Sequence, residues 1–215
     1  MRSILLVDDH AVVRNGLKQI LVEHLDLVVF GEANDAIEAM QQVRKQDWSL
    51  VILDIRLPGR SGVEVLKQIK SEKPQLPVLI VSSYPESQYA VRLIQVGAAG
   101  YITKDAEESE IVKAVKTAAA GGRYINEVVG GLLASSVSRN FSNEDGSTLY
   151  ESLSNREYQI FLELASGKRA KDIAEKLQVS AKTIATHRSR LMLKMGFSNN
   201  AELTLYANKS GLLLE

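Results

Sequence analysis

Hydrophobic residues in the first 120 positions follow two alternating patterns. Short, uninterrupted apolar runs, many of them β-branched, predict strands that are buried on both faces of a parallel sheet. These runs are Ile4–Val7, Leu27–Phe30, Leu50–Leu53, Val78–Val81 and Ala99–Ile102. The segments with helical spacing of apolar residues are Val12–Leu25, Ala36–Val43, Val63–Ile69, Gln88–Val96 and Ile111–Ala119. Five strands alternating with five helices predict a doubly wound α/β domain over residues 1–120.

The α/β pattern weakens over residues 121–149, which we expect to form a partly helical linker. A helix is predicted near Asn126–Ser138. The stretch that follows, about residues 139–149, is polar and has too few apolar side chains to hold itself folded. We therefore expect the second part of the linker to be flexible.

Residues 150–215 carry only helical patterns and predict an all-α domain of four helices. Ser154 followed three residues later by Glu157 has the spacing of a capping box, which predicts where the first helix begins. This helix is expected to end near Gly167, and the second is predicted at Lys171–Leu177.

A tight turn at Gln178–Ser180 separates the second helix from the third. Ser180 is expected to cap the third helix, which runs from about Ala181 to Met195, and Ser198 is expected to cap the fourth. Two helices joined by so short a turn predict a helix-turn-helix within the four-helix unit.

Composition excludes several kinds of site. The chain has no cysteine and three histidines, so a disulfide scaffold, a thiolate zinc site and a cysteine nucleophile are ruled out. The apolar run near the N-terminus is too short for a signal-peptide core or for a membrane span of about 20 residues. We therefore expect a cytoplasmic protein with no membrane partner.

Charge is divided unevenly along a chain that is neutral overall, with 26 basic and 26 acidic residues. Residues 1–148 hold 16 Lys and Arg against 19 Asp and Glu, a net charge of −3. Residues 149–215 hold 10 against 7, a net charge of +3. This small asymmetry favours an acidic module joined to a basic one that meets an anionic partner.

Acidic side chains follow two of the predicted strands, and a hydroxyl and an ammonium follow two others. Asp8 and Asp9 come after the first strand, Asp54 after the third, Ser82 after the fourth and Lys104 after the fifth. The carboxyl ends of parallel strands meet at one edge of the sheet, where such folds bind ligands. Crowded carboxylates need a cation, and hard oxygen ligands suit Mg²⁺. This set predicts attack of Asp54 on a phosphorus atom, with Lys104 and the metal neutralising the phosphoryl oxygens.

Taken singly, each of these residues has an ordinary structural explanation. A carboxylate after a strand often caps a helix, a lone lysine is usually solvated, and a serine is common in turns. Their joint position after four separate strands is what favours a site.

The motifs that carry these residues resemble the receiver domain of two-component response regulators. They are Leu6-Val-Asp-Asp-His10, Leu53-Asp-Ile-Arg-Leu-Pro-Gly59 with Gly62, Val81-Ser-Ser83 and Tyr101-Ile-Thr-Lys104. The resemblance implies a flavodoxin-like fold in which Asp54 accepts a phosphoryl group from a phosphohistidine of a sensor histidine kinase. It also implies that Mg²⁺ is bound directly by Asp9, Asp54 and the Arg56 backbone carbonyl, and through water by Asp8. Ser82 and Tyr101 match the switch pair.

The predicted third helix mixes cations with short polar side chains, which suits the major groove of DNA. A solvated, charged helix face is the alternative, and the preceding helix-turn-helix pattern favours DNA. Over residues 150–212 the chain resembles the LuxR/NarL-type DNA-binding domain in Leu153-Ser-Asn-Arg-Glu157, Ala165-Ser-Gly-Lys168, Lys171-Asp-Ile-Ala-Glu-Lys-Leu177, Val179-Ser-Ala-Lys-Thr-Ile184, His187-Arg188 and Leu193-Lys-Met195.

That second resemblance implies positions for the DNA contacts. Ala185, Thr186 and Ser189 would face bases, and Lys182, Thr183, Arg188 and Arg190 would lie near phosphates. Family members often carry lysine where this chain has Ala185 and Ser189, so readout would depend more on methyl contacts, water and DNA shape. Two alternatives stay open for His187, a phosphate contact and an inward-facing side chain.

Together the two modules predict a phosphorylation-controlled transcription factor rather than an enzyme. We expect it to form a homodimer on phosphorylation or on DNA, which would place two recognition helices on adjacent half-sites. RNA polymerase is a further candidate partner. The alternative from another class is an aspartyl-phosphate phosphohydrolase with a C-terminal docking domain, using Asp8 or Asp54 as nucleophile.

Overall fold

The computed structural model describes residues 2–26, 28–142 and 149–213. Contacts divide the chain into two compact units, Met1–Gly131 and Leu132–Glu215.

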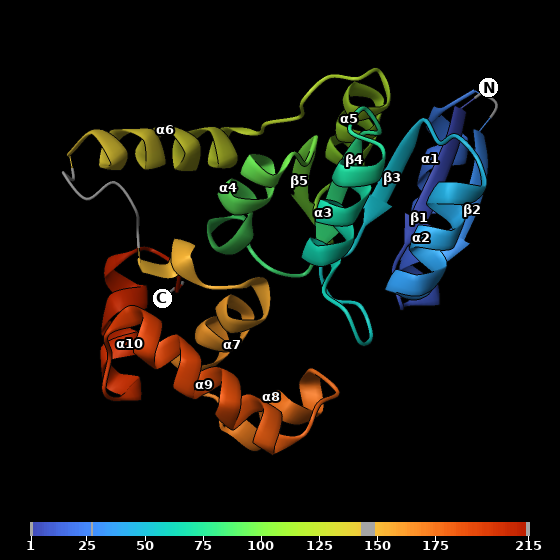
Figure 1. The fold of residues 1–215 in the computed structure, drawn as a ribbon. Helices are drawn as coiled ribbons and strands as arrows, with labels where there is room; N and C mark the ends of the chain where they lie inside the picture. The colour runs from blue at the N-terminus through green and yellow to red at the C-terminus, as the bar shows by residue number, and fades with distance from the viewer. Residues whose placement is uncertain (1, 27, 143–148, 214–215) are drawn as a thin grey trace. The chain divides into compact units, whose positions relative to one another are not determined.

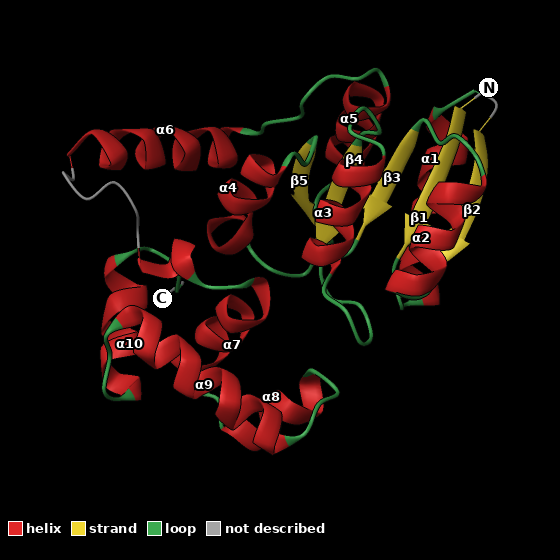
Figure 2. Cartoon of the chain, in the orientation of Figure 1, coloured by secondary structure: helices red, strands yellow, loops and turns green. Residues whose placement is uncertain are grey.

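The N-terminal unit is built on a five-stranded parallel sheet with the strand order β2-β1-β3-β4-β5 (Figure 2). The strands are β1 (Arg2–Val7), β2 (Val28–Ala33), β3 (Leu50–Leu53), β4 (Val78–Ser82) and β5 (Gly100–Thr103). The order reverses at β1, which lies between β2 and β3. The predicted doubly wound α/β domain is therefore confirmed.

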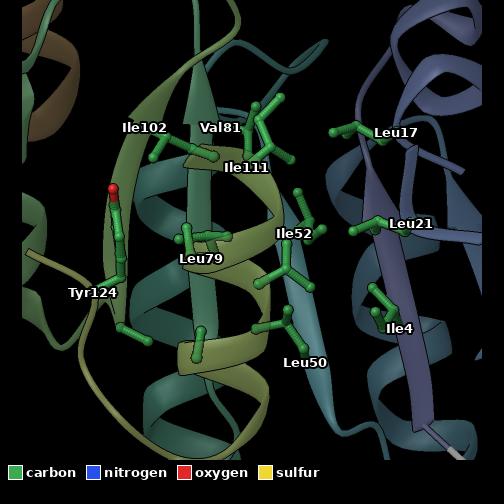
Figure 3. Close-up of a cluster of buried hydrophobic side chains, with 14 of the residues drawn as sticks. Ile4, Leu17, Leu21, Leu50, Ile52, Leu79, Val81, Ile102, Ile111 and Tyr124 are labelled. Carbon is green, nitrogen blue, oxygen red and sulfur yellow. The ribbon is translucent and has the colours of Figure 1, made fainter. Parts of the chain in front are cut away.

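Five helices cover both faces of this sheet (Figure 1). They are α1 (Ala11–His24), α2 (Ala36–Lys45), α3 (Gly62–Glu72), α4 (Glu86–Val96) and α5 (Glu108–Ala119). α1 and α5 pack together on one face, and their apolar sides meet Ile4, Leu50 and Leu79 of the sheet (Figure 3). α2, α3 and α4 lie on the other face. Because both faces are covered, β3 and β4 are buried along their whole length.

The prediction that every strand is buried on both faces is wrong for β2. Of its six residues only Ala33 is buried, and Val29 is 40% exposed. β2 lies at the edge of the sheet and pairs only with β1, so one side of it stays open to solvent. Leu27, which the pattern placed at the start of this strand, lies outside the described residues.

The chain after α5 stays attached to the N-terminal unit. Tyr124 is 7% exposed, and its backbone N–H donates to the Ala99 carbonyl over 2.7 Å. The Tyr124 hydroxyl and the Asn126 amide both donate to Glu110 of α5 over 3.1 Å. These contacts hold the segment against β5 and α5.

The helix predicted in the linker is present as α6 (Glu127–Ser142). Asn126 begins it, since its side-chain oxygen accepts a hydrogen bond from Val129 N over 2.9 Å. Residues 139–142, which were expected to be flexible, continue this helix, and residues 143–148 lie outside the described part of the chain. The division into domains 1–120 and 150–215 with a linker at 121–149 stays a prediction.

The C-terminal unit contains the four predicted helices, preceded by the short 3-10 helix η1 (Leu149–Ser152). The helices are α7 (Asn155–Ala165), α8 (Ala170–Lys176), α9 (Ala181–Met195) and α10 (Asn200–Lys209). The capping box of Ser154 and Glu157 is confirmed, with both of its hydrogen bonds formed. Ser180 caps α9 as expected, accepting from Thr183 N over 3.1 Å.

The expected cap of the last helix is off by one residue. Asn199, not Ser198, caps α10, because the Asn199 side chain accepts from Glu202 N over 3.1 Å. The Glu202 carboxylate reaches back and accepts from Ser198 N over 2.7 Å. Glu202 therefore stands three residues after the cap, the position from which a carboxylate can complete such a pair.

Candidate functional site: an acidic cluster and a basic helix

The carboxyl edge of the sheet brings the predicted acidic residues together. Asp8 follows β1, Asp54 follows β3 and Lys104 follows β5. Backbone hydrogen bonds fix these positions: Asp54 N donates to Val7 O over 2.9 Å, and Lys104 N donates to Ser82 O over 2.8 Å. Ser82 is the last residue of β4 rather than the first after it.

Lys104 bridges two buried carboxylates. Its Nζ lies 2.6 Å from Asp8 Oδ2 and 2.8 Å from Asp54 Oδ2, while the two carboxylates are 4% and 2% exposed. Burial raises the pKa of Asp54 above its ordinary value, although Lys104 opposes this shift. Burial alone would lower the pKa of Lys104, but attraction to Asp54 and Asp8 raises it. The ammonium is therefore held in its charged form.

The second oxygen of Asp54 has no such partner. Among the described residues, Asp54 Oδ1 is a buried side-chain oxygen without a hydrogen-bond partner. An unsatisfied buried oxygen is costly, and it commonly marks a group that binds a ligand. Asp8, Asp9, His10 and Asp54 each offer a ligand atom within 4.8 Å of the others. Three of these are hard carboxylate oxygens, the donors that Mg²⁺ prefers, so the residues fit this ion.

A glycine allows the start of α3 to lie directly against the acidic cluster. A Cβ at Gly62 would stand 2.0 Å from the carbonyl oxygen of Asp54, and Gly62 N donates to Ile55 O over 2.8 Å. No larger residue fits without moving either the helix or Asp54. The ligand role of the neighbouring Arg56 carbonyl stays a prediction.

Ser82 and Tyr101, the expected switch pair, both lie inward and both contact Tyr84. Each is 0% exposed. The Ser82 hydroxyl accepts from Tyr84 N over 3.3 Å, and the Tyr101 hydroxyl donates to Tyr84 O over 2.6 Å. Burial raises the pKa of the Tyr101 hydroxyl, which therefore stays protonated and able to donate. The pair thus shares contacts with the segment between β4 and α4, and its switch role stays a prediction.

Two side chains next to the cluster were not predicted from the sequence. His10 Nδ1 lies 2.6 Å from Asp9 Oδ1, and Arg14 Nη1 donates to the Asp8 carbonyl oxygen over 2.6 Å. The motif after the first strand includes His10 but gave it no role, and the helical pattern gave no reason to place a charged Arg14 inside. Arg14 reaches a backbone carbonyl six positions earlier, and no local spacing pattern signals such a contact.

The C-terminal unit presents most of its predicted DNA-contact residues to solvent. Exposed positions on α9 are Lys182, Ala185, Thr186, Ser189 and Arg190, while Thr183 and Arg188 are partly buried. The side chains that anchor α9 lie on its opposite side and are buried: Ile184, Leu191 and Met195. Arg188 Nε donates to Asn200 Oδ1 over 3.0 Å, which orients its guanidinium beside α10.

Three lysines of this unit are engaged by buried glutamates of α7. Lys194 lies 2.6 Å from Glu157, which is 3% exposed. Glu163, 4% exposed, binds Lys168 over 2.6 Å and also binds Lys176. These ion pairs join α7 to the segments around α8 and α9. Each of the three ammonium groups is therefore paired within the unit, with Lys168 and Lys176 sharing one carboxylate.

His187 lies on the half-buried side of α9. Within the described part of the chain its Nδ1 is buried and has no hydrogen-bond partner, and burial lowers its pKa. A neutral, inward-facing imidazole contributes little to phosphate binding. Of the two alternatives for His187, the structure favours packing.

Family comparisons agree with this division into two units. Residues 4–116 match the family described as response regulator receiver domain. Residues 151–207 match bacterial regulatory proteins, luxR family. The chain therefore belongs to the response regulators that join a receiver domain to a LuxR-type DNA-binding domain, the two resemblances that its motifs indicated.

Similar proteins share this organisation over their whole length. Response regulator GacA of Pseudomonas aeruginosa is 33% identical over 99% of this chain and 98% of its own. Oxygen regulatory protein NreC of Staphylococcus carnosus is 35% identical over 98% and 99%. RcsB from Salmonella enterica serovar Typhimurium, solved bound to promoter rprA with the phosphomimetic BeF₃⁻, superimposes with a TM-score of 0.62 at 25% identity, over 96% and 98%.

These relatives decide between the two functions considered. The chain is a DNA-binding response regulator of a two-component system, as its motifs predicted, and the phosphohydrolase alternative is disfavoured. In the described part of the chain, each helix is too short or too polar to cross a membrane.

Proposed function

We propose that Asp54 is the phosphoacceptor of this response regulator. The observation that carries the proposal is the difference between the two oxygens of the Asp54 carboxylate. Oδ2 accepts from Lys104 over 2.8 Å, while Oδ1 is buried without a hydrogen-bond partner among the described residues. One oxygen is thereby oriented and the other is left to form a bond. Asp8 and Asp9 complete the acidic cluster at the same edge of the sheet.

The transfer we propose is a displacement at phosphorus. An oxygen of the Asp54 carboxylate forms a bond to the phosphorus of a phosphohistidine on a sensor histidine kinase, and the P–N bond to the imidazole breaks. Mg²⁺, bound by Asp9, Asp54 and the Arg56 carbonyl and through water by Asp8, would supply charge neutralisation for the phosphoryl oxygens.

Lys104 and Ser82 act on the product. The Lys104 ammonium lies close enough to Asp54 to exchange its contact with the carboxylate for one with a phosphoryl oxygen. The Ser82 hydroxyl would donate a hydrogen bond to another, which would weaken its contact with Tyr84 N. Tyr101 donates to the carbonyl of the same Tyr84. Phosphorylation at Asp54 would therefore change the hydrogen bonds that hold the segment between β4 and α4.

The output we propose is a change in how α9 binds double-stranded DNA. Its exposed side carries Lys182 and Arg190 among short residues, which suits phosphate contacts around a major groove. RcsB, solved on promoter DNA, supports this use of the domain. Homodimer formation, contact with RNA polymerase, a cytoplasmic location and the absence of enzymatic turnover stay predictions.

Acetyl phosphate labelling tests the phosphoacceptor. We expect the chain to incorporate phosphate in the presence of Mg²⁺ and the Asp54→Asn variant to incorporate none. Asp47→Asn is the matched control, because Asp47 is an exposed aspartate paired with Lys73 outside the cluster. Stoichiometric labelling of Asp54→Asn would show that another residue is the acceptor.

A further inference from the structure

Arg14 is a buried cation that the proposed phosphoryl transfer does not use. It stands on the first turn of α1, is 9% exposed and donates from Nη1 to the backbone carbonyl oxygen of Asp8 over 2.6 Å. Burying a guanidinium is costly unless it is paired and hydrogen-bonded. A buried guanidinium that donates to the backbone of an acidic-cluster residue therefore indicates a role beyond packing.

The charge of Arg14 is partly balanced by a glutamate of β2. Glu32 Oε2 accepts from Arg14 Nε over 2.8 Å, and its other oxygen is bound by Lys18. Hydrogen bonds from Lys18 and then from Arg14 lower the pKa of Glu32, so the carboxylate stays ionised. Glu32 carries one negative charge against the two positive charges of Arg14 and Lys18, so this group of three keeps a net charge of +1.

The hydrogen bond from Arg14 is one of several that hold Asp8 in the turn after β1. Asp8 N donates to Ala33 O over 3.2 Å, and Asp8 Oδ1 accepts from His10 N over 2.8 Å. The carbonyl of Asp8 belongs to the peptide that leads into Asp9. Fixing that carbonyl holds the plane of the peptide to which the Asp9 Cα is attached, and so restricts the directions open to the Asp9 side chain.

We propose that Arg14 is a positioning residue for the divalent cation, acting by holding the Asp8–Asp9 peptide in its binding orientation. The inference rests on the proposed Mg²⁺ site. It makes a prediction opposite in sign to simple electrostatics. Removing a positive charge close to a cation site would tighten cation binding if charge alone mattered. Removing a positioning hydrogen bond would weaken it, by about ten- to a hundredfold for groups that orient metal ligands.

Calorimetric titration of the full chain with Mg²⁺ distinguishes these outcomes. We expect Arg14→Met to bind Mg²⁺ about ten- to a hundredfold more weakly than the parent. Arg14→Lys, which keeps the charge and can donate one hydrogen bond to the same carbonyl, should lie between the two. Arg44→Met is the matched control, because Arg44 also pairs with a glutamate, Glu72, but joins α2 to α3 away from the cluster.

Each result bears on a separate claim. Unchanged or tighter Mg²⁺ binding by Arg14→Met overturns the positioning role, as does a loss of equal size in Arg44→Met. If Arg14→Met does not fold, Arg14→Lys decides: several-fold weaker binding supports the role, and the affinity of the parent contradicts it. A parent chain that binds no Mg²⁺ would instead overturn the metal site of the proposed function, and with it this inference.

Discussion

Lys104 Nζ lies 2.8 Å from Asp54 Oδ2 and 2.6 Å from Asp8 Oδ2, so one ammonium is shared by two buried carboxylates and offsets only one of their two charges. The three groups come from the ends of three different strands, and the cluster exists only when the sheet is formed. Folding therefore brings like charges close together, and their repulsion lowers the free energy of unfolding. A bound cation relieves this repulsion, which is the physical reason for the cluster's affinity for cations.

Replacing Lys104 with Met should destabilise the chain more as the pH rises. Without the ammonium, the pKa of Asp54, already raised by burial, rises further. A raised carboxyl pKa favours folding at low pH, and that contribution is lost as the pH rises through the folded-state value. Urea unfolding with a chelator should show a loss of about 3 kcal/mol at pH 8 and a smaller loss at pH 5.

Mg²⁺ provides the control for the Lys104→Met experiment. A divalent cation should restore more stability to Lys104→Met than it adds to the parent, since it replaces the missing charge. A loss of stability that is equal at both pH values, or that Mg²⁺ leaves unchanged, would contradict the account of Lys104 as the neutralising group.

Gly62→Ala should damage both stability and phosphate incorporation. Its Cβ would stand 2.0 Å from the carbonyl oxygen of Asp54, so α3 or Asp54 must move. Such overpacking costs about 1–3 kcal/mol. Gly16→Ala in α1 is the matched control, because a Cβ there meets no atom within 4 Å and alanine favours helix. Thermal unfolding and acetyl phosphate labelling of both variants test this, and wild-type labelling of Gly62→Ala would count against it.

Lys182→Ala and Lys168→Ala should affect DNA binding differently. Lys182 is exposed on α9, whereas Lys168 is held 2.6 Å from the buried Glu163. Loss of one phosphate contact reduces the slope of log affinity against log salt by about 0.9. We expect this change for Lys182→Ala on every DNA sequence, with no change for Lys168→Ala. Equal slopes for Lys182→Ala and the parent would exclude Lys182 from the phosphate contacts.

Much of the fold follows from local patterns in the sequence. Leu50–Leu53 reads as a strand because four apolar residues stand between polar ones, and the structure has β3 at those same bounds. Asp54 and Lys104 could be paired without coordinates, because parallel strands end at the same edge of a sheet. The same logic failed for β2, since nothing local marks a strand as the edge of its sheet.

Contacts between distant charged residues could not be predicted. Arg14 is buried because Glu32, eighteen positions later, balances it, and Glu163 is buried because Lys168 and Lys176 surround it. Hydrophobic periodicity treats charged residues as solvent-facing, so it has no means to detect a buried ion pair. As a result, some of the lysines that make the C-terminal unit basic are already paired with carboxylates of the same unit.

The most direct test of the account compares operator affinity before and after phosphorylation of the same preparation. DNA fragments would be selected from random sequence by binding to the chain, and incorporation of phosphate at Asp54 verified by mass spectrometry. We expect phosphorylation with Mg²⁺ and acetyl phosphate to change affinity for the selected DNA in the parent and to leave Asp54→Asn unchanged. An acyl phosphate that forms fully on Asp54 while DNA affinity stays the same would contradict the account.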